Sequence, residues 1–82
     1  MNITDALDAQ RVARLREIRA QAANLNGPDL IALAVRHCQS QADLARLSGL
    51  TANTITAIKK GQPLNQSSRN AILWAIARSL GI

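Results

Sequence analysis

The stretch Gln41–Lys60, QADLARLSGLTANTITAIKK, constrains the fold more than any other part of the chain. It predicts two short helices joined by a tight turn. Ser40 stands where the first helix would begin, and Asp43 follows three residues later, close to a capping box. Gly49 stands where the chain must reverse, and Thr51 precedes the second helix as a cap. The stretch therefore predicts helices over residues 41–47 and 52–60.

Apolar residues in this stretch are spaced so that the two helices can pack on each other. Ala45, Leu47 and Leu50 can contact Ile55 and Ile58 inside the angle between the helices. Leu50 and Ile55 also occupy the two positions of a hydrophobic staple around the cap of the second helix. From the residues alone, an αα-hairpin with no role in DNA binding remains open.

This stretch resembles the helix-turn-helix of the Cro/CI-like (XRE) family of DNA-binding regulators in its small residue Ala45, its turn residue Gly49 and the spacing of its apolar positions. The resemblance covers residues 28–82 and not residues 1–26. It implies an all-α fold, a lambda-repressor-like helix-turn-helix bundle of four short helices, here with an extra N-terminal helix. The residues that carry it are Leu44, Ala45, Gly49, Leu50, Ile55 and Ile58.

Composition supports a single small helical domain. The chain has 82 residues, one Trp and no Phe or Tyr, so its core must be built from Leu, Ile, Val and Ala. A sheet would favour aromatic and β-branched residues, whereas this set suits packed helices. We therefore expect an all-α fold.

The distribution of charge suggests a polyanionic partner. The formal net charge is +5, and no acidic residue follows Asp43. A basic surface that merely aids solubility is the alternative. The cations after this point are Arg46, Lys59, Lys60, Arg69 and Arg78.

Residues 1–26 form an N-terminal extension, which the sequence Asn26-Gly27-Pro28 separates from the domain at 27–82. Gly27 is expected to end the first helix and Pro28 to open the next. Arg11 interrupts the apolar stripe and is expected to pair with Asp8 or reach water. The extension can pack on its own domain, dimerise, or carry arginines to DNA. Its stripe consists of Leu7, Leu15, Ile18, Ala22 and Leu25.

The remaining helices are expected over residues 28–38 and from about Ser67 to Leu80. Leu73, Ile76, Ala77 and Leu80 form the predicted core stripe of the last helix. Ile72 and Trp74 flank that stripe, and each is either covered by the N-terminal helix or contacts a second copy. The candidate dimer-interface residues are Leu15, Ile18, Leu25, Ile72 and Trp74.

Little in the sequence suggests catalysis, a metal or a cofactor. Cys38 lies on the apolar face of residues 28–38 and is expected to be a small core residue, with His37 at the surface. One Cys and one His build neither a disulfide nor a metal site, so we expect no enzyme and no metal. The chain shows no membrane span and no signal peptide, which suggests a reducing, cytoplasmic setting.

The resemblance also implies which residues contact DNA. The second helix of the motif would lie in the major groove of double-stranded DNA. Its base-contacting residues would be Ala52, Asn53, Thr54 and Thr56. The phosphate-contacting residues would be Gln41, Arg46, Thr51, Lys59, Lys60 and Arg69.

These expectations describe a homodimer on an inverted-repeat operator, as in small stand-alone transcription regulators of phages, mobile elements and restriction-modification systems. We expect no membrane partner and no small-molecule ligand. The alternative is a helical protein-interaction module, or an antitoxin-like partner, without specific DNA binding.

Overall fold

The computed structural model of the protein describes residues 3–81. Within this range the fold is entirely helical, which confirms the expected all-α class. The helices are α1 (Ile3–Ala22), α2 (Gly27–Cys38), α3 (Gln41–Ser48), α4 (Ala52–Lys59) and α5 (Gln66–Ser79).

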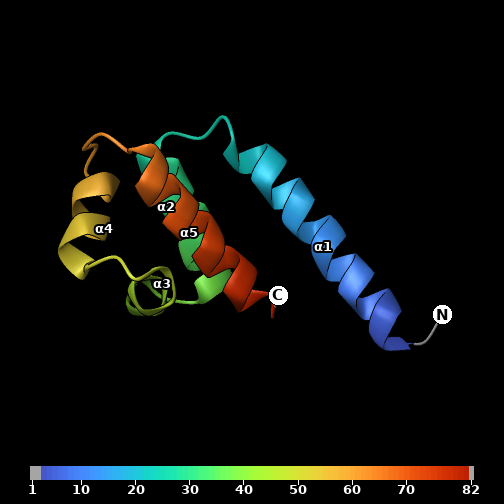
Figure 1. The fold of residues 1–82 in the computed structure, drawn as a ribbon. Coiled ribbons are helices and arrows are strands. Elements are labelled where there is room, and N and C mark those ends of the chain that lie inside the picture. Colours follow the sequence, from blue (N-terminus) through green and yellow to red (C-terminus); the bar gives the residue numbers. More distant parts are fainter. Residues whose placement is uncertain (1–2, 82) are drawn as a thin grey trace.

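Helices α2 to α5 form a compact body, and α1 projects from it as an arm (Figure 1). In the body, α5 packs against both α2 and α3, while α4 packs against α2 and α3. The Cα radius of gyration is 13.2 Å and the longest dimension is 45 Å. A compact chain of this length would have a radius of about 12 Å, so the difference reflects the projecting arm.

Only the second half of α1 is attached to the body. Ile18 and Ala22 are buried in the core, whereas Ile3 and Leu7 are exposed. Arg11 pairs with Asp8 across 3.6 Å, as its position in the stripe predicted. Packing on its own domain is thus the role that the structure gives to the C-terminal half of the helix. Because Ile18 is buried within the protomer, the expectation that it contacts a second copy is wrong.

Arg69 fastens the end of α1 to α5. Its guanidinium donates hydrogen bonds to the carbonyl oxygens of Ala22 (2.9 Å) and Leu25 (3.0 Å). Both carbonyls lie where α1 ends and its last backbone acceptors lack helical partners. Arg69 therefore belongs to the fold, which contradicts the expectation that it contacts a phosphate.

The starts and ends of the helices follow local capping rules. Ser40 and Thr51 cap α3 and α4 by accepting from backbone N–H groups three residues ahead, as predicted. Gly49 ends α3 with φ +75°, a left-handed conformation that favours glycine, also as predicted. Asn65 caps α5, which begins at Gln66 and ends at Ser79, one residue earlier at each end than expected.

Gly27 has a different role from the predicted one. Helix α1 already ends at Ala22, and Gly27 is the first residue of α2. A Cβ at Gly27 would lie 2.8 Å from Cγ2 of Ile58, closer than real contacts allow. The glycine is therefore required by the approach of α4 to the start of α2, and it does not terminate the first helix.

The buried face of α5 is rotated from the predicted stripe. Ile72, Ala75, Ile76 and Ala77 are buried, whereas Leu73 and Leu80 are only partly covered. Helix α5 is enclosed by α2 and α3 together, so its buried arc is wider than a single stripe. Since Ile72 is fully buried, the expectation that it contacts a second copy is wrong.

Cys38 confirms its predicted role as a small core residue. The side chain is buried, and its Sγ lies 3.7 Å from the carbonyl oxygen of Ala75. Burial raises the pKa of the Cys38 thiol, so the neutral form is favoured.

Candidate nucleic-acid interface

Helix α4 has one buried face and one open face. Ile55 and Ile58 are buried against the body, while Ala52 and Asn53 at the first turn are exposed. Within residues 3–81 the structure gives the Asn53 carboxamide no hydrogen-bond partner. Both its donor and its acceptor capacity are therefore available to a molecule outside the protein.

The first turn of α4 is held by its own cap. The Thr51 hydroxyl accepts from the N–H of Thr54 (3.1 Å) and lies 2.9 Å from the Thr54 hydroxyl. These contacts fix the turn that carries Asn53. Ala52, Asn53 and Thr54, three of the predicted base-contacting residues, thus lie on one capped turn directly after Thr51.

Thr56, the fourth predicted base-contacting residue, is linked to α3. The Gln41 side chain donates from Nε2 to the Thr56 hydroxyl across 3.1 Å. Thr56 is partly buried, one turn further along α4 than Ala52. Because the amide nitrogen of Gln41 carries two hydrogens, one donor remains after this bond is made. The bridge fixes the start of α3 relative to the middle of α4.

The predicted phosphate-contacting residues do not form one cluster. Gln41 and Lys59 border the same hollow of about 310 Å³, which runs along α2. Lys60, the next residue, is exposed and is the C-cap residue of α4. Arg46 lies at the end of α3, where it pairs with Asp43 across 3.2 Å.

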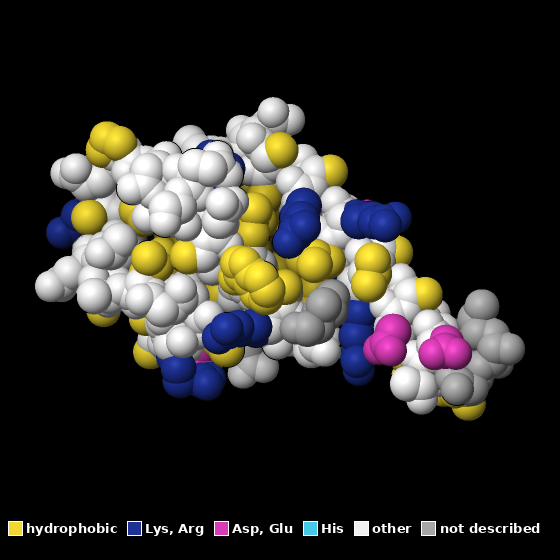
Figure 2. All heavy atoms as spheres, viewed as in Figure 1, with side chains coloured by type: hydrophobic (Ala, Val, Ile, Leu, Met, Phe, Trp, Pro, Cys, Tyr) yellow, Lys and Arg dark blue, Asp and Glu magenta, His cyan; other side chains and the backbone are white. Residues whose placement is uncertain are grey.

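The spatial separation of charge follows the elements. Figure 2 shows Lys and Arg side chains at the edge of the body over α4, and acidic side chains near the far end of α1. Asp5 and Asp8 are the acidic residues of the first turns of α1. Residues 27–82, which include the body, carry six Lys or Arg and two acidic residues, whereas residues 1–26 carry four Arg and three acidic residues, so most of the net positive charge lies on the body.

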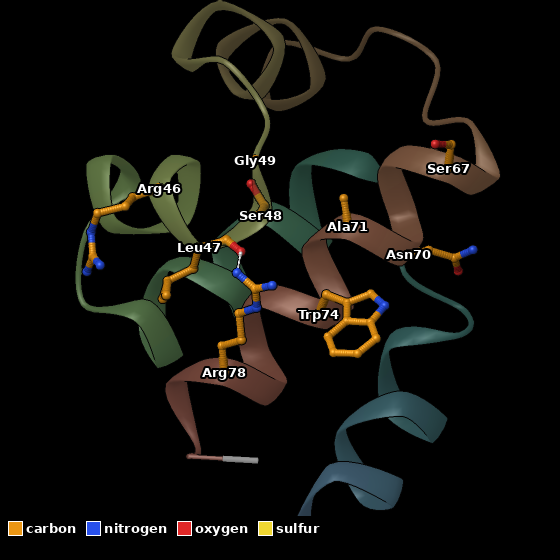
Figure 3. A pocket seen from close by; sticks show the side chains of 9 residues that line it. All are labelled: Arg46, Leu47, Ser48, Gly49, Ser67, Asn70, Ala71, Trp74 and Arg78. Carbon is orange, nitrogen blue, oxygen red and sulfur yellow. Dashed lines mark hydrogen bonds between the residues drawn. The ribbon is translucent and has the colours of Figure 1, made fainter.

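A second feature is a groove between the end of α3 and α5, which we call the Trp74 groove (Figure 3). It encloses about 470 Å³, and Leu47, Ala71 and the indole of Trp74 supply its apolar wall. Trp74 is 59% exposed. Arg78 projects from the same helix and donates to the carbonyl oxygen of Leu47 across 3.5 Å.

Sequence reasoning found the exposed Trp74 and missed the groove. The groove forms because Arg46, Leu47 and Gly49 at the end of α3 lie opposite α5, which follows later in the chain, after α4. Helical periodicity reports which face of α5 is apolar, and it carries no information about what lies opposite.

His37, expected at the surface, is partly buried. Burial lowers the pKa of its imidazole, and the nearby cations Arg14 and Arg36 lower it further. In the described part of the chain, no three His, Cys, Asp or Glu side chains are grouped so that they could hold a metal ion. Among residues 3–81 no helix combines the length and the apolar character needed to cross a membrane.

Comparisons with protein-family models, with curated proteins and with solved structures find no match to this chain.

Proposed function

We propose that the protein binds double-stranded DNA sequence-specifically, as a homodimer on an inverted-repeat operator, and thereby regulates transcription. Part of this proposal is that the body, α2 to α5, is a lambda-repressor-like domain of the Cro/CI-like (XRE) type. The observation that supports it best is the first turn of α4, an exposed and uncharged surface with cations at the other end of the helix. On this turn the Asn53 amide has no hydrogen-bond partner among residues 3–81.

In this proposal α4 enters the major groove with its first turn toward the bases. The Asn53 carboxamide pairs with adenine through two hydrogen bonds: its amide nitrogen donates to N7, and its oxygen accepts from the N6 amino group. The methyl groups of Ala52 and Thr54 are suited to contact with a thymine methyl. The Thr56 hydroxyl, held by Gln41, reaches bases or water one turn deeper.

Phosphate contacts set the position of the helix. The remaining Gln41 N–H and the Lys59 ammonium flank the same hollow, so one phosphate can be approached by both. Lys60 is exposed next to Lys59 and reaches a flanking phosphate. Arg46 contributes less, because the Asp43 carboxylate already neutralises part of its charge.

Two copies are needed for useful affinity. One such domain contacts a half-site of a few base pairs, and a single small module buries too little surface for tight binding. A symmetric dimer with half-sites about 34–36 Å apart, one turn of DNA, reads an inverted repeat and doubles the phosphate contacts.

The test is selection of genomic fragments by the purified full chain at near-physiological salt. The proposal predicts recovery of fragments that share an inverted repeat. Asn53→Ala is then expected to lose roughly 10- to 100-fold in preference at one base pair of each half-site, with unchanged thermal stability. Asn24→Ala, an exposed asparagine far from α4, is the matched control and should change nothing. Fragments without a common motif would contradict the proposal.

A second candidate function is a helical protein-interaction module without specific DNA binding, and the exposed Trp74 groove favours it. This candidate predicts that no fragment is enriched at any salt concentration. It also predicts that Trp74→Ala abolishes binding to a protein partner while Asn53→Ala has no effect.

A further inference from the structure

We propose that the Trp74 groove binds the first turns of α1 from a second copy of this chain, and that the two copies exchange these arms reciprocally. The inference deepens the proposed function, since it names the surface of the homodimer on which that proposal rests. Its own test measures association without DNA, so each can fail while the other holds.

Among residues 3–81, no element covers the apolar face of the first turns of α1. By helical spacing Ile3 and Leu7 lie on the same face of α1 as the buried Ile18 and Ala22. Contact with the body reaches as far as Arg11, whose guanidinium carbon lies 3.8 Å from the position that a Cβ on Gly81 would take. Beyond this point the same face continues into solvent, with Ile3 79% and Leu7 46% exposed.

The groove offers an apolar surface of matching kind. The exposed indole of Trp74 borders the groove on one side and, on the other, a smaller hollow of about 290 Å³ that reaches Arg19 of α1. Figure 2 shows hydrophobic side chains gathered in this central region, between the body and α1. The indole therefore forms a ridge with space on both sides, at the base of the arm. A helix of a second copy that lay beside this indole would contact both Trp74 and the α1 arm of the protomer that carries the groove.

Charge favours this occupant over an unrelated apolar helix. Arg78 borders the groove together with Arg46, which is partly neutralised by Asp43, and Arg19 borders the hollow beside it. The stretch 3–10 of α1 carries two acidic residues, Asp5 and Asp8, at exposed positions, and no cation. Asp8 also pairs with Arg11 across 3.6 Å, but an exposed ion pair of this kind contributes little and leaves the carboxylate accessible to a second cation. Placing this stretch at the groove brings acidic residues to a cationic rim, whereas two arms laid side by side in parallel would bring like charges together.

In a two-fold symmetric dimer, the contact between an arm and a groove occurs twice. In an isologous dimer the arm of each copy lies on the groove of the other, so the arms run antiparallel past each other. Each contact places aliphatic side chains on a tryptophan, the residue type most often found at the energetic centre of interfaces. The same arrangement covers Ile3, Leu7 and Trp74, three of the large hydrophobic side chains that the protomer leaves exposed.

The experiment measures self-association of the full chain in the absence of DNA. Sedimentation equilibrium gives the mass of the species in solution, and tryptophan emission is recorded as a function of protein concentration. Trp74 is the single Trp, so the emission reports this site alone. Association is expected to shift the emission to the blue. Leu7→Asp and Trp74→Ala should each weaken the dimer roughly 1,000-fold, because each substitution removes the same contact at two places in the symmetric dimer. Val12→Asp is the matched control, because Val12 is 42% exposed on the same helix but about 140° from Leu7.

Mixing the two variants tests the pairing of arm with groove. Leu7→Asp keeps an intact groove, and Trp74→Ala keeps an intact arm and has no tryptophan. Adding excess Trp74→Ala to Leu7→Asp should therefore shift the remaining emission to the blue and restore heavier species. If the interface were arm against arm, or Trp74 against Trp74, the mixture would show no shift. That result would overturn the proposal, as would emission that is independent of concentration, or a Val12→Asp variant as weak as Leu7→Asp.

Discussion

Replacing Arg69 by alanine removes both hydrogen bonds that join α5 to the end of α1. The guanidinium donates to the carbonyls of Ala22 and Leu25 at 2.9 and 3.0 Å. A net hydrogen bond from a charged donor contributes about 1.5–3 kcal/mol. The Ala22 oxygen, however, also accepts from the Leu25 N–H at 3.1 Å and so keeps one partner in the variant.

We therefore expect Arg69→Ala to lower the free energy of unfolding by about 2–3 kcal/mol, less than two full bonds. The total stability of a chain of this size is only about 4–12 kcal/mol. In a domain this small the loss corresponds to a fall in melting temperature of roughly 8–20 °C. The melting temperature of Arg69→Lys should lie between those of the unchanged protein and Arg69→Ala, because an ammonium lacks the planar fork that reaches both carbonyls.

The assay is thermal unfolding followed by far-UV circular dichroism. Arg46→Ala is the control, since it removes an exposed ion pair with Asp43 that contributes at most about 1 kcal/mol. Equal melting temperatures for Arg69→Ala and Arg46→Ala would refute the reasoning that Arg69 fastens the arm.

Three further predictions concern separate parts of the molecule. Lys60→Ala should weaken binding to all DNA sequences alike and should reduce the number of counterions released by a dimer by about two. Fluorescence anisotropy at several salt concentrations measures both effects, and a loss of binding confined to one sequence would contradict this prediction. Gly27→Ala should cost about 1–3 kcal/mol in urea unfolding, because its Cβ would meet Ile58 at 2.8 Å, and an unchanged midpoint would disprove the close approach. The Cys38 thiol is buried and its pKa is raised, so it should react with iodoacetamide at least ~100-fold more slowly in the folded protein than in denaturant. Equal reaction rates in the two conditions would show that the thiol is accessible.

The features that the sequence predicted correctly depend on neighbours along the chain. Ser40 and Thr51 cap helices through N–H groups three residues away, and Gly49 ends α3 through its own backbone angles. These roles are fixed within one turn, so residue type and position suffice to recognise them.

The features that were missed depend on distant partners. Arg69 binds carbonyls 44 and 47 residues earlier, and its charge alone suggested a phosphate contact. Gly27 is required by Ile58 across the body, although its place before Pro28 suggested the end of a helix. Spacing on α5 likewise cannot reveal that two helices enclose it and bury Ile72.

The candidate DNA surface stands between these cases. The exposure of Asn53 follows from the buried positions of Ile55 and Ile58, which the periodicity of α4 predicts. The bridge from Gln41 to Thr56 joins two helices, and no pattern within either helix indicates it. The DNA contacts themselves remain predictions for the binding experiments above.

The uneven attachment of α1 has a consequence for amide hydrogen exchange. Backbone hydrogen bonds in its first two turns can open without breaking any contact with the body, so these amides should exchange at low free-energy cost in the monomer. Amides near Ile18 and Ala22, buried and next to the Arg69 bonds, should open only with the body. One continuous helix thus contains two units of different local stability, and the boundary between them lies near Arg11.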